Sequence, residues 1–120
     1  MAADYSDVWF GHNTWTSFAS MTRIFKEYKF KTNNKSEKAL TIAMSSYPGA
    51  INSIDDFYIT SQDLFVTETT NSIFNNSLYD LLSPESLLVW QRVMVANRLS
   101  TTGKEWVEIF ARYNSGTYNN

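Results

Sequence analysis

Apolar residues recur every three or four positions in three stretches of the chain, the spacing of one face of an α-helix. These stretches are the amphipathic segment 16–29, residues 87–99 and residues 106–113. Ser83-Pro84-Glu85 predicts the start of the second helix, because it combines a hydroxyl cap, a proline suited to the first turn and an acid near the positive end of the helix dipole. Thr102-Gly-Lys-Glu105 predicts a capping box at the start of the third helix.

Short runs of apolar, aromatic and β-branched residues predict four strands, at residues 6–11, 40–44, 56–60 and 64–67. The link between the last two runs is short enough for a hairpin, so we expect that pair to be antiparallel. Residues 71–80 fit neither a helical nor a strand pattern. The order of strand, helix, three strands and two helices favours an α+β fold with a largely antiparallel sheet.

Composition narrows the class of protein and the chemistry open to it. With 120 residues, 43% of them hydrophobic, the chain is one domain or part of one, and its net charge of −2 argues against nucleic acid as a partner. No apolar run approaches the ~20 residues of a membrane span, and the first residues do not have the pattern of a signal peptide.

The absence of cysteine excludes thiol nucleophiles and disulfides within these residues. With a single histidine we expect neither a zinc site nor another cofactor.

The candidate chemistry centres on His12, the only histidine, in the block Gly11-His-Asn-Thr-Trp15. A titratable ring beside a large aromatic, where a predicted strand meets a predicted helix, is a candidate part of an active site. Thr70 follows a predicted strand, where its hydroxyl could donate to a carbonyl or oxyanion with Glu68 supporting it. The alternatives are a hydrogen-bonded junction histidine, a core aromatic at Trp15, and an ordinary threonine and exposed acid at a strand end.

Two further groups of polar residues have simpler interpretations. A Ser–His–Asp triad can be drawn from Ser45 or Ser46, His12, and Asp55 or Asp56, but the spacing does not select it, and serines before a Pro-Gly pair favour a turn. Asn34-Lys-Ser36 and Asn75-Asn-Ser77 are glycosylation sequons, which matter only if the chain is exported.

Several blocks of residues, taken together and in order, resemble the phospholipase B-like family, which includes the lamina ancestor and lysosomal 66-kDa-type proteins. The blocks are His12-Asn-Thr-Trp15, Met21-Thr-Arg-Ile24, Ser45-Ser-Tyr-Pro-Gly49, Asp55-Asp-Phe-Tyr58, Glu68-Thr-Thr70, Val95-Ala-Asn-Arg-Leu99 and Tyr113-Asn-Ser-Gly-Thr-Tyr-Asn-Asn120. The resemblance extends from about Val8 to Asn120.

This resemblance implies an N-terminal-nucleophile hydrolase fold, an αββα sandwich, in a secreted or lysosomal glycoprotein that degrades lipid. Residues 1–120 would form the middle section of such a domain. The family's N-terminal cysteine would attack an ester or amide carbonyl of a phospholipid or other acyl substrate, with its own α-amino group as the base. By resemblance His12 lies beside that nucleophile, and Trp15 and Thr70 are candidates for the same pocket.

The sequence departs from the family pattern at the position of the nucleophile. The family's cysteine lies shortly before the His-x-Thr-Trp block, and residues 1–11 contain none. We therefore expect a partial domain, in need of its missing remainder, that is inactive in isolation. Two rival hypotheses are a non-catalytic lipid-binding module with a groove lined by Trp9, Phe10 and Trp15, and a subunit that complements a chain bearing the cysteine.

Overall fold

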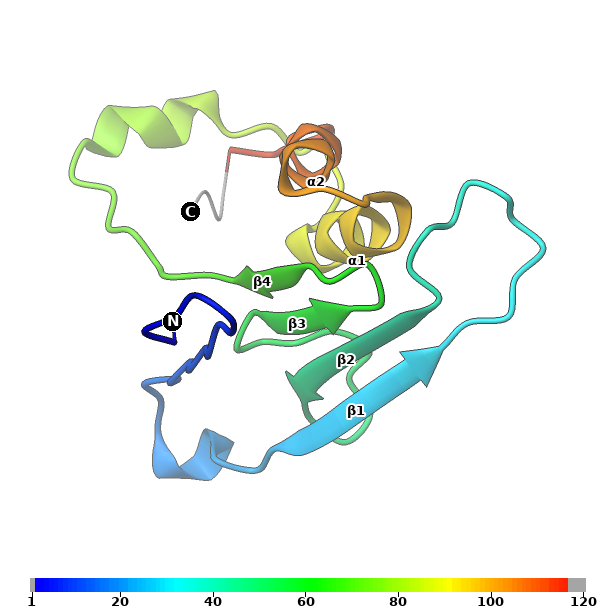
Figure 1. The fold of residues 1–120 in the computed structure, drawn as a ribbon. Helices are drawn as coiled ribbons and strands as arrows, with labels where there is room; N and C mark the ends of the chain where they lie inside the picture. The colour runs from blue at the N-terminus through cyan, green and yellow to red at the C-terminus, as the bar shows by residue number, and fades with distance from the viewer. Residues whose placement is uncertain (1, 117–120) are drawn as a thin grey trace.

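The computed structural model describes residues 2–116 and shows an α+β fold, as the order of elements predicts. A four-stranded antiparallel sheet carries two α-helices against one of its faces (Figure 1). The strands lie side by side in chain order: β1 (Ile24–Lys29), β2 (Thr41–Ser46), β3 (Phe57–Thr60) and β4 (Phe65–Thr67). The α-helices are α1 (Val89–Leu99) and α2 (Gly103–Phe110). Two short 3₁₀ helices are formed by Phe18–Ser20 and by Asn76–Leu81.

The three strands predicted over 40–44, 56–60 and 64–67 are confirmed as β2, β3 and β4. The predicted hairpin is also confirmed, because β3 and β4 pair antiparallel with Tyr58 opposite Val66. Thr60 closes the turn between them by donating its main-chain N–H to the carbonyl oxygen of Leu64 at 3.0 Å. Their apolar and β-branched residues therefore behave as the strand pattern indicates.

The helix predicted over 16–29 is wrong. Ile24–Lys29 forms the edge strand β1, paired with all of β2 from Ile24 opposite Ser46 to Lys29 opposite Thr41. The apolar positions fit the helical period better than a period of two, because Lys26 takes an inner position of β1, but pairing of all six residues with β2 outweighs the local pattern. Lys26 lies on the same side of β1 as Tyr28, where its ammonium group donates to the carbonyl of Ala50 at 2.5 Å.

The strand predicted over 6–11 is also wrong, since these residues have no partner strand in the described structure. A strand needs a ladder of hydrogen bonds, and a short apolar run without one stays extended but unpaired. The ring of Phe10 instead contacts Phe65 with 4.1 Å between ring centroids. Trp9 and Phe10 are 71% and 62% exposed, so the run is not buried.

The start predicted for α1 at residues 83–85 is wrong, although its end at Leu99 is confirmed. The main-chain N–H groups of Ser83 and Leu87 donate to the carbonyls of Ser115 and Tyr113, which ties this segment to the chain after α2. Those contacts hold the segment out of the helix, and α1 begins at Val89 with the Gln91 side chain accepting from the N–H of Leu88 at 3.0 Å.

Of the two hydrogen bonds of the capping box predicted for α2, the one accepted by Thr102 is confirmed. Thr102 Oγ1 accepts the N–H of Glu105 at 3.2 Å, as in a capping box. The Glu105 carboxylate reaches one residue further than expected and accepts from the N–H and hydroxyl of Thr101 at 2.8 Å each. The helix ends at Phe110, three residues before the apolar pattern does.

The core lies between the sheet and the two helices. Its fully or almost fully buried residues are Ile42, Met44, Tyr58 and Val93. Partly buried aromatic and aliphatic residues from β1, β4 and both helices pack around them: Tyr28, Phe30, Val66, Met94, Trp106 and Phe110. Strand residues alternate between the faces of a sheet. The opposite face therefore carries Phe25 and Ile59, which are 66% and 42% exposed.

Tyr58 joins this core to the loop between β2 and β3. Its hydroxyl accepts the N–H of Ser53 at 2.8 Å and donates to the carbonyl of Ser53 at 3.1 Å, both in the interior. Burial raises the pKa of Tyr58 well above its ordinary value, so the hydroxyl stays protonated. The tyrosine therefore holds the loop two residues before Asp55.

Replacing Tyr58 by phenylalanine is expected to lower the free energy of unfolding by about 2 kcal/mol, because both main-chain groups of Ser53 lose a buried partner. Urea unfolding measures the loss. Tyr28→Phe is the matched control: its hydroxyl lies 3.4 Å from the Ala50 carbonyl, a contact that Lys26 shares. An equal loss in the two variants would contradict the role given to Tyr58.

Candidate functional site

His12, Trp15 and Thr70, three residues singled out along the sequence, line one cleft of about 490 Å³. The remaining lining residues come from the same two segments and from the loop between β2 and β3: Asn13, Thr14, Glu68 and Thr69, and Ile54 and Asp55. The extended segment 12–15, the loop before β3 and the chain after β4 therefore meet at one place. The volume falls in the range of small-molecule sites, and the lining mixes one large aromatic with imidazole, hydroxyl and carboxylate groups.

His12 is partly buried, and its Nε2 lies 2.6 Å from the main-chain carbonyl oxygen of Asp55. The ring is thus held by the loop between β2 and β3. The interpretation as a hydrogen-bonded histidine and the interpretation as a cleft residue are both compatible with this position.

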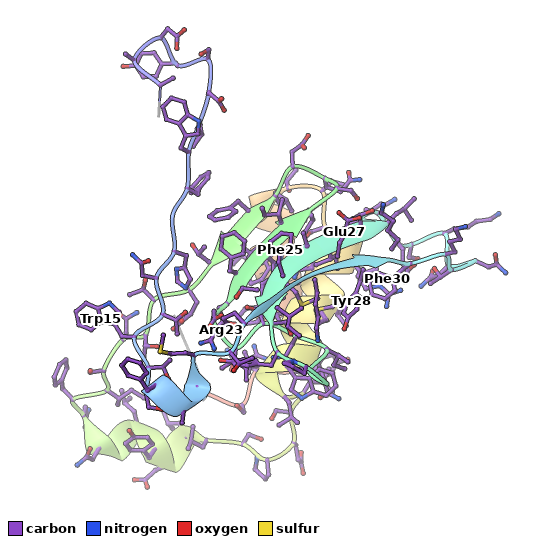
Figure 2. All side chains as sticks on the ribbon, turned by 90° about the horizontal axis from the view of Figure 1, so that it is seen from below. Trp15, Arg23, Phe25, Glu27, Tyr28 and Phe30 are labelled. Atoms are coloured by element: carbon purple, nitrogen blue, oxygen red, sulfur yellow. The ribbon has the colours of Figure 1, made fainter. Side chains whose placement is uncertain are left out.

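Trp15 is 97% exposed and stands away from the sheet (Figure 2). The alternative that it is a core aromatic at a helix start is therefore wrong, because the helix that would have buried it does not form. Its indole is available to an apolar ligand at the cleft. Trp9 and Phe10 are not among the residues that line this cleft.

Thr70 is exposed, and its hydroxyl donates to Glu68 Oε1 at 2.8 Å. Glu68 thus contacts Thr70 directly, but it accepts the hydroxyl proton that the sequence hypothesis assigns to a carbonyl or oxyanion of the substrate. In this arrangement the hydroxyl donates its proton to the carboxylate, so Thr70 can only accept a hydrogen bond from a ligand.

Asp55 connects the segments of the cleft, a role different from the one that the triad hypothesis gives it. Its side chain is 5% exposed. The guanidinium of Arg23 donates to both carboxylate oxygens, from Nε to Oδ2 at 2.5 Å and from Nη2 to Oδ1 at 2.8 Å. Ser45 Oγ donates to Oδ2 at 2.6 Å, and the Thr14 side chain also hydrogen-bonds the carboxylate. The sequence signal for the pair is that Arg23 and Asp55 each fall within a block that resembles the family.

The electrostatics of this cluster favour the ionised carboxylate. Burial by itself raises the pKa of Asp55, but the hydrogen bonds from Arg23, Ser45 and Thr14, with the positive charge of Arg23, bring it below its ordinary value. Arg23 is held in turn by the ring of Tyr47, 4.4 Å from its guanidinium carbon, and by the carbonyls of Ser20 and Thr22.

The residues of the Ser–His–Asp triad that the sequence permits are not arranged as a triad. Ser45 Oγ donates to Asp55 and not to the imidazole, and His12 contacts the main chain of Asp55 instead of its carboxylate. Ser46 is buried and donates to the carbonyl of Asn52 at 2.7 Å. A triad requires the serine to pass its proton to the histidine, so this geometry supports turn and loop roles for both serines.

Acidification is expected to weaken the fold below about pH 4 through Asp55. A carboxyl whose folded pKa lies below its unfolded value of about 3.9 stabilises the fold above that value, and the contribution is lost as the pH falls through the folded pKa. Urea unfolding between pH 6 and pH 3 measures the loss. We expect a shallower pH dependence in Asp55→Asn, which has no carboxyl to protonate at this position, and identical profiles would contradict the assignment.

Between residues 2 and 116, no three His, Cys, Asp or Glu side chains come together in a group that could hold a metal ion. Over the same range, none of the helices has the length and apolar character needed to cross a membrane.

Comparison with known proteins gives a consistent result. The model of a family described as Phospholipase B matches residues 1–120. Phospholipase B-like 1 of Rattus norvegicus is 47% identical over 116 residues, which are 97% of this chain and 21% of that protein. Phospholipase B-like protein B of Dictyostelium discoideum is 50% identical over 98% of this chain and 21% of its own length. Phospholipase B of Crotalus adamanteus is 44% identical over 97% of this chain and 21% of its own length.

The chain thus spans about a fifth of the length of the curated relatives that it matches. The family match nevertheless extends over all 120 residues, and the identities lie far above the level at which family membership is in question. The chain belongs to the phospholipase B family.

Proposed function

We propose that this chain supplies one wall of the substrate cleft of a phospholipase B-like acyl hydrolase, which cleaves carboxylic ester or amide bonds of phospholipids. The observation that carries this proposal is the meeting of His12, Trp15 and Thr70 in one cleft, although Thr70 lies far from the other two in the sequence. Relatives of this chain are themselves named phospholipase B.

The chemistry of the cleft suits an acyl substrate. The exposed indole of Trp15 offers a surface for the acyl chain, and Glu68 and Thr70 form a polar end. His12 is the group that can orient the substrate or exchange a proton with it. The attacking atom has no candidate here, because the sequence holds no cysteine and Ser45 is bonded to a buried carboxylate. We therefore place the nucleophile outside these residues and expect no turnover by this chain in isolation.

The described fold would be one part of a larger domain. The relatives extend well beyond the matched residues, and the open face of the sheet exposes Phe25 and Ile59. A second antiparallel sheet packed on this face would bury both and produce the αββα sandwich of N-terminal-nucleophile hydrolases. Residues 1–120 would form the middle section of that domain.

A secreted or lysosomal location is also part of the proposal. Both sequon asparagines are exposed: Asn34 lies just before a turn, and Asn75 caps the 3₁₀ segment Asn76–Leu81. Asn75 Oδ1 accepts from the N–H and the hydroxyl of Ser77 at 3.1 and 2.8 Å, and Asn34 Oδ1 accepts the N–H of Ser36 at 3.0 Å. Expression through a secretory pathway, followed by glycosidase treatment of the wild type and of Asn34→Gln and Asn75→Gln, tests whether these sites carry glycans.

The activity is tested with the purified chain and a fluorogenic phospholipid. We expect binding without release of fatty acid, and weaker binding in Trp15→Ala. Turnover by the chain alone would contradict the placement of the nucleophile.

A second experiment separates the hydrolase from the rival lipid-binding module. The chain is mixed with the cysteine-bearing remainder of a relative, and release of fatty acid is followed. Recovery of activity only in this mixture favours a chain that complements a cysteine-bearing partner, and loss of that recovery in His12→Ala supports the role of the cleft. Binding that never leads to release in any mixture would favour the lipid-binding module.

A further inference from the structure

We propose that Asp55 is a positioning residue: its main-chain carbonyl keeps the proton of neutral His12 on Nε2 and leaves Nδ1 as the proton-accepting atom, while its carboxylate, clamped by Arg23, holds that carbonyl in place. This assignment deepens the proposed function and rests on it, because it concerns the state of the imidazole that lines the cleft. This role of Asp55 differs from that of the acid in the triad hypothesis, because His12 contacts its main-chain carbonyl and Ser45 donates to its carboxylate.

The hydrogen-bonding partner of the ring determines where its proton lies. A main-chain carbonyl oxygen has only lone pairs, so a contact of 2.6 Å from Nε2 requires that Nε2 carry the hydrogen. In a neutral imidazole the other nitrogen is then an acceptor. A proton taken from a water or hydroxyl in the cleft would bind to Nδ1, and the bond from Nε2–H to Asp55 would stay as it is.

The carbonyl can perform this task only if the loop that carries it is fixed, and the carboxylate of the same residue fixes it. Arg23, just before β1, donates to both carboxylate oxygens, and Ser45 Oγ, on β2, donates to Oδ2. The Thr14 side chain bonds the same carboxylate from the segment that contains His12. Asp55 therefore binds the His12–Trp15 segment twice, once through its main chain and once through its side chain.

Arginine is required at position 23 because of geometry and not only because of charge. A planar guanidinium can donate in parallel from two nitrogens to the two oxygens of a carboxylate, whereas a lysine ammonium is a point donor. The same group stacks on Tyr47 and donates to the carbonyls of Ser20 and Thr22, so both its position and its orientation are fixed. An Arg23→Lys variant would keep the positive charge and lose this planar clamp.

The test uses the 120-residue chain labelled with ¹⁵N and ¹³C, in which His12 gives the only imidazole signals. At a pH where the ring is neutral, we expect a protonated Nε2, an unprotonated Nδ1, and a scalar coupling through the hydrogen bond between Nε2 and the carbonyl carbon of Asp55. In folded Arg23→Lys that coupling is expected to disappear, and exchange of the Nε2 proton with water should speed up roughly tenfold, the equivalent of about one hydrogen bond.

Two controls separate positioning from general stability. Lys29→Gln removes an exposed ion pair with Glu27 on the same strand and should leave the His12 signals unchanged. Val93→Ala destabilises the core from α1 and, while folded, should also leave them unchanged. A proton found on Nδ1 of the neutral ring in the wild type would overturn the proposal, whether or not any variant folds. So would an unaltered coupling in Arg23→Lys. No lipid is present, so either failure leaves the proposed function to its own test.

Discussion

Replacing Asp55 by alanine is expected to lower the free energy of unfolding by about 3 kcal/mol. The substitution removes a carboxylate that is 5% exposed and that accepts hydrogen bonds from Arg23, Ser45 and Thr14. Arg23 then keeps a positive charge at a partly buried position without its partner. Because its side chain is 24% exposed, water relieves part of this cost, and we expect the lower end of the range for broken buried ion pairs.

Urea unfolding of Asp55→Ala measures this loss. Asp55→Asn is expected to lose about half as much, since an amide oxygen can still accept hydrogen bonds although it no longer neutralises Arg23. Asp80→Ala is the matched control, because Asp80 is exposed in the 3₁₀ segment Asn76–Leu81 and its loss should stay within about 0.5 kcal/mol. A loss of stability in Asp55→Ala no larger than in this control would show that the hydrogen bonds of the Asp55 carboxylate do not hold the loop between β2 and β3.

The second large effect is expected for Ile42→Ala, with a loss of about 3 kcal/mol. Ile42 is 0% exposed on β2 and belongs to the core cluster with Met44, Tyr58 and Val93. Truncation removes buried methyl groups and leaves a cavity that the strands on either side, both paired with β2, cannot close.

Ile59→Ala is the matched control for Ile42→Ala. Ile59 lies on the neighbouring strand β3 but on the opposite face of the sheet, where it is 42% exposed, so its truncation should cost about 1 kcal/mol or less. The difference between the two isoleucines in urea unfolding measures how differently the two faces are covered. Equal losses would contradict the assignment of the core to the helical side alone.

The sequence predicts the parts of this fold whose pattern has one interpretation. β3 and β4 follow from two short apolar runs with a link too short for anything but a hairpin, and Thr102 marks the start of α2 because a hydroxyl cap is a local interaction. The segment 24–29 has a pattern that favours a helix, although it forms β1. Its inward lysine, Lys26, is satisfied by the carbonyl of Ala50, a partner from a distant loop that no local pattern reveals.

The sequence likewise predicts some residues of the candidate site and misses one of its contacts. His12, Trp15 and Thr70 were predicted from residue types in a local context together with resemblance to the family, and the structure brings all three to one cleft. The link between Arg23 and Asp55 was not predicted, because it joins residues 32 positions apart whose meeting depends on the pairing of β1 with β2. Long-range contacts of this kind follow from the assembled sheet and not from the spacing of residues.

We propose that the cleft lined by His12, Trp15 and Thr70 receives the acyl substrate. Nuclear magnetic resonance of the labelled chain, titrated with a short-chain lysophospholipid below its micelle concentration, tests this most directly. Saturable shifts are expected in the signals of residues 12–15, 54–55 and 68–70, and these shifts should be weaker in Trp15→Ala. Shifts confined to the open face of the sheet around Phe25 and Ile59, with the signals of His12 and Thr70 unmoved, would contradict it.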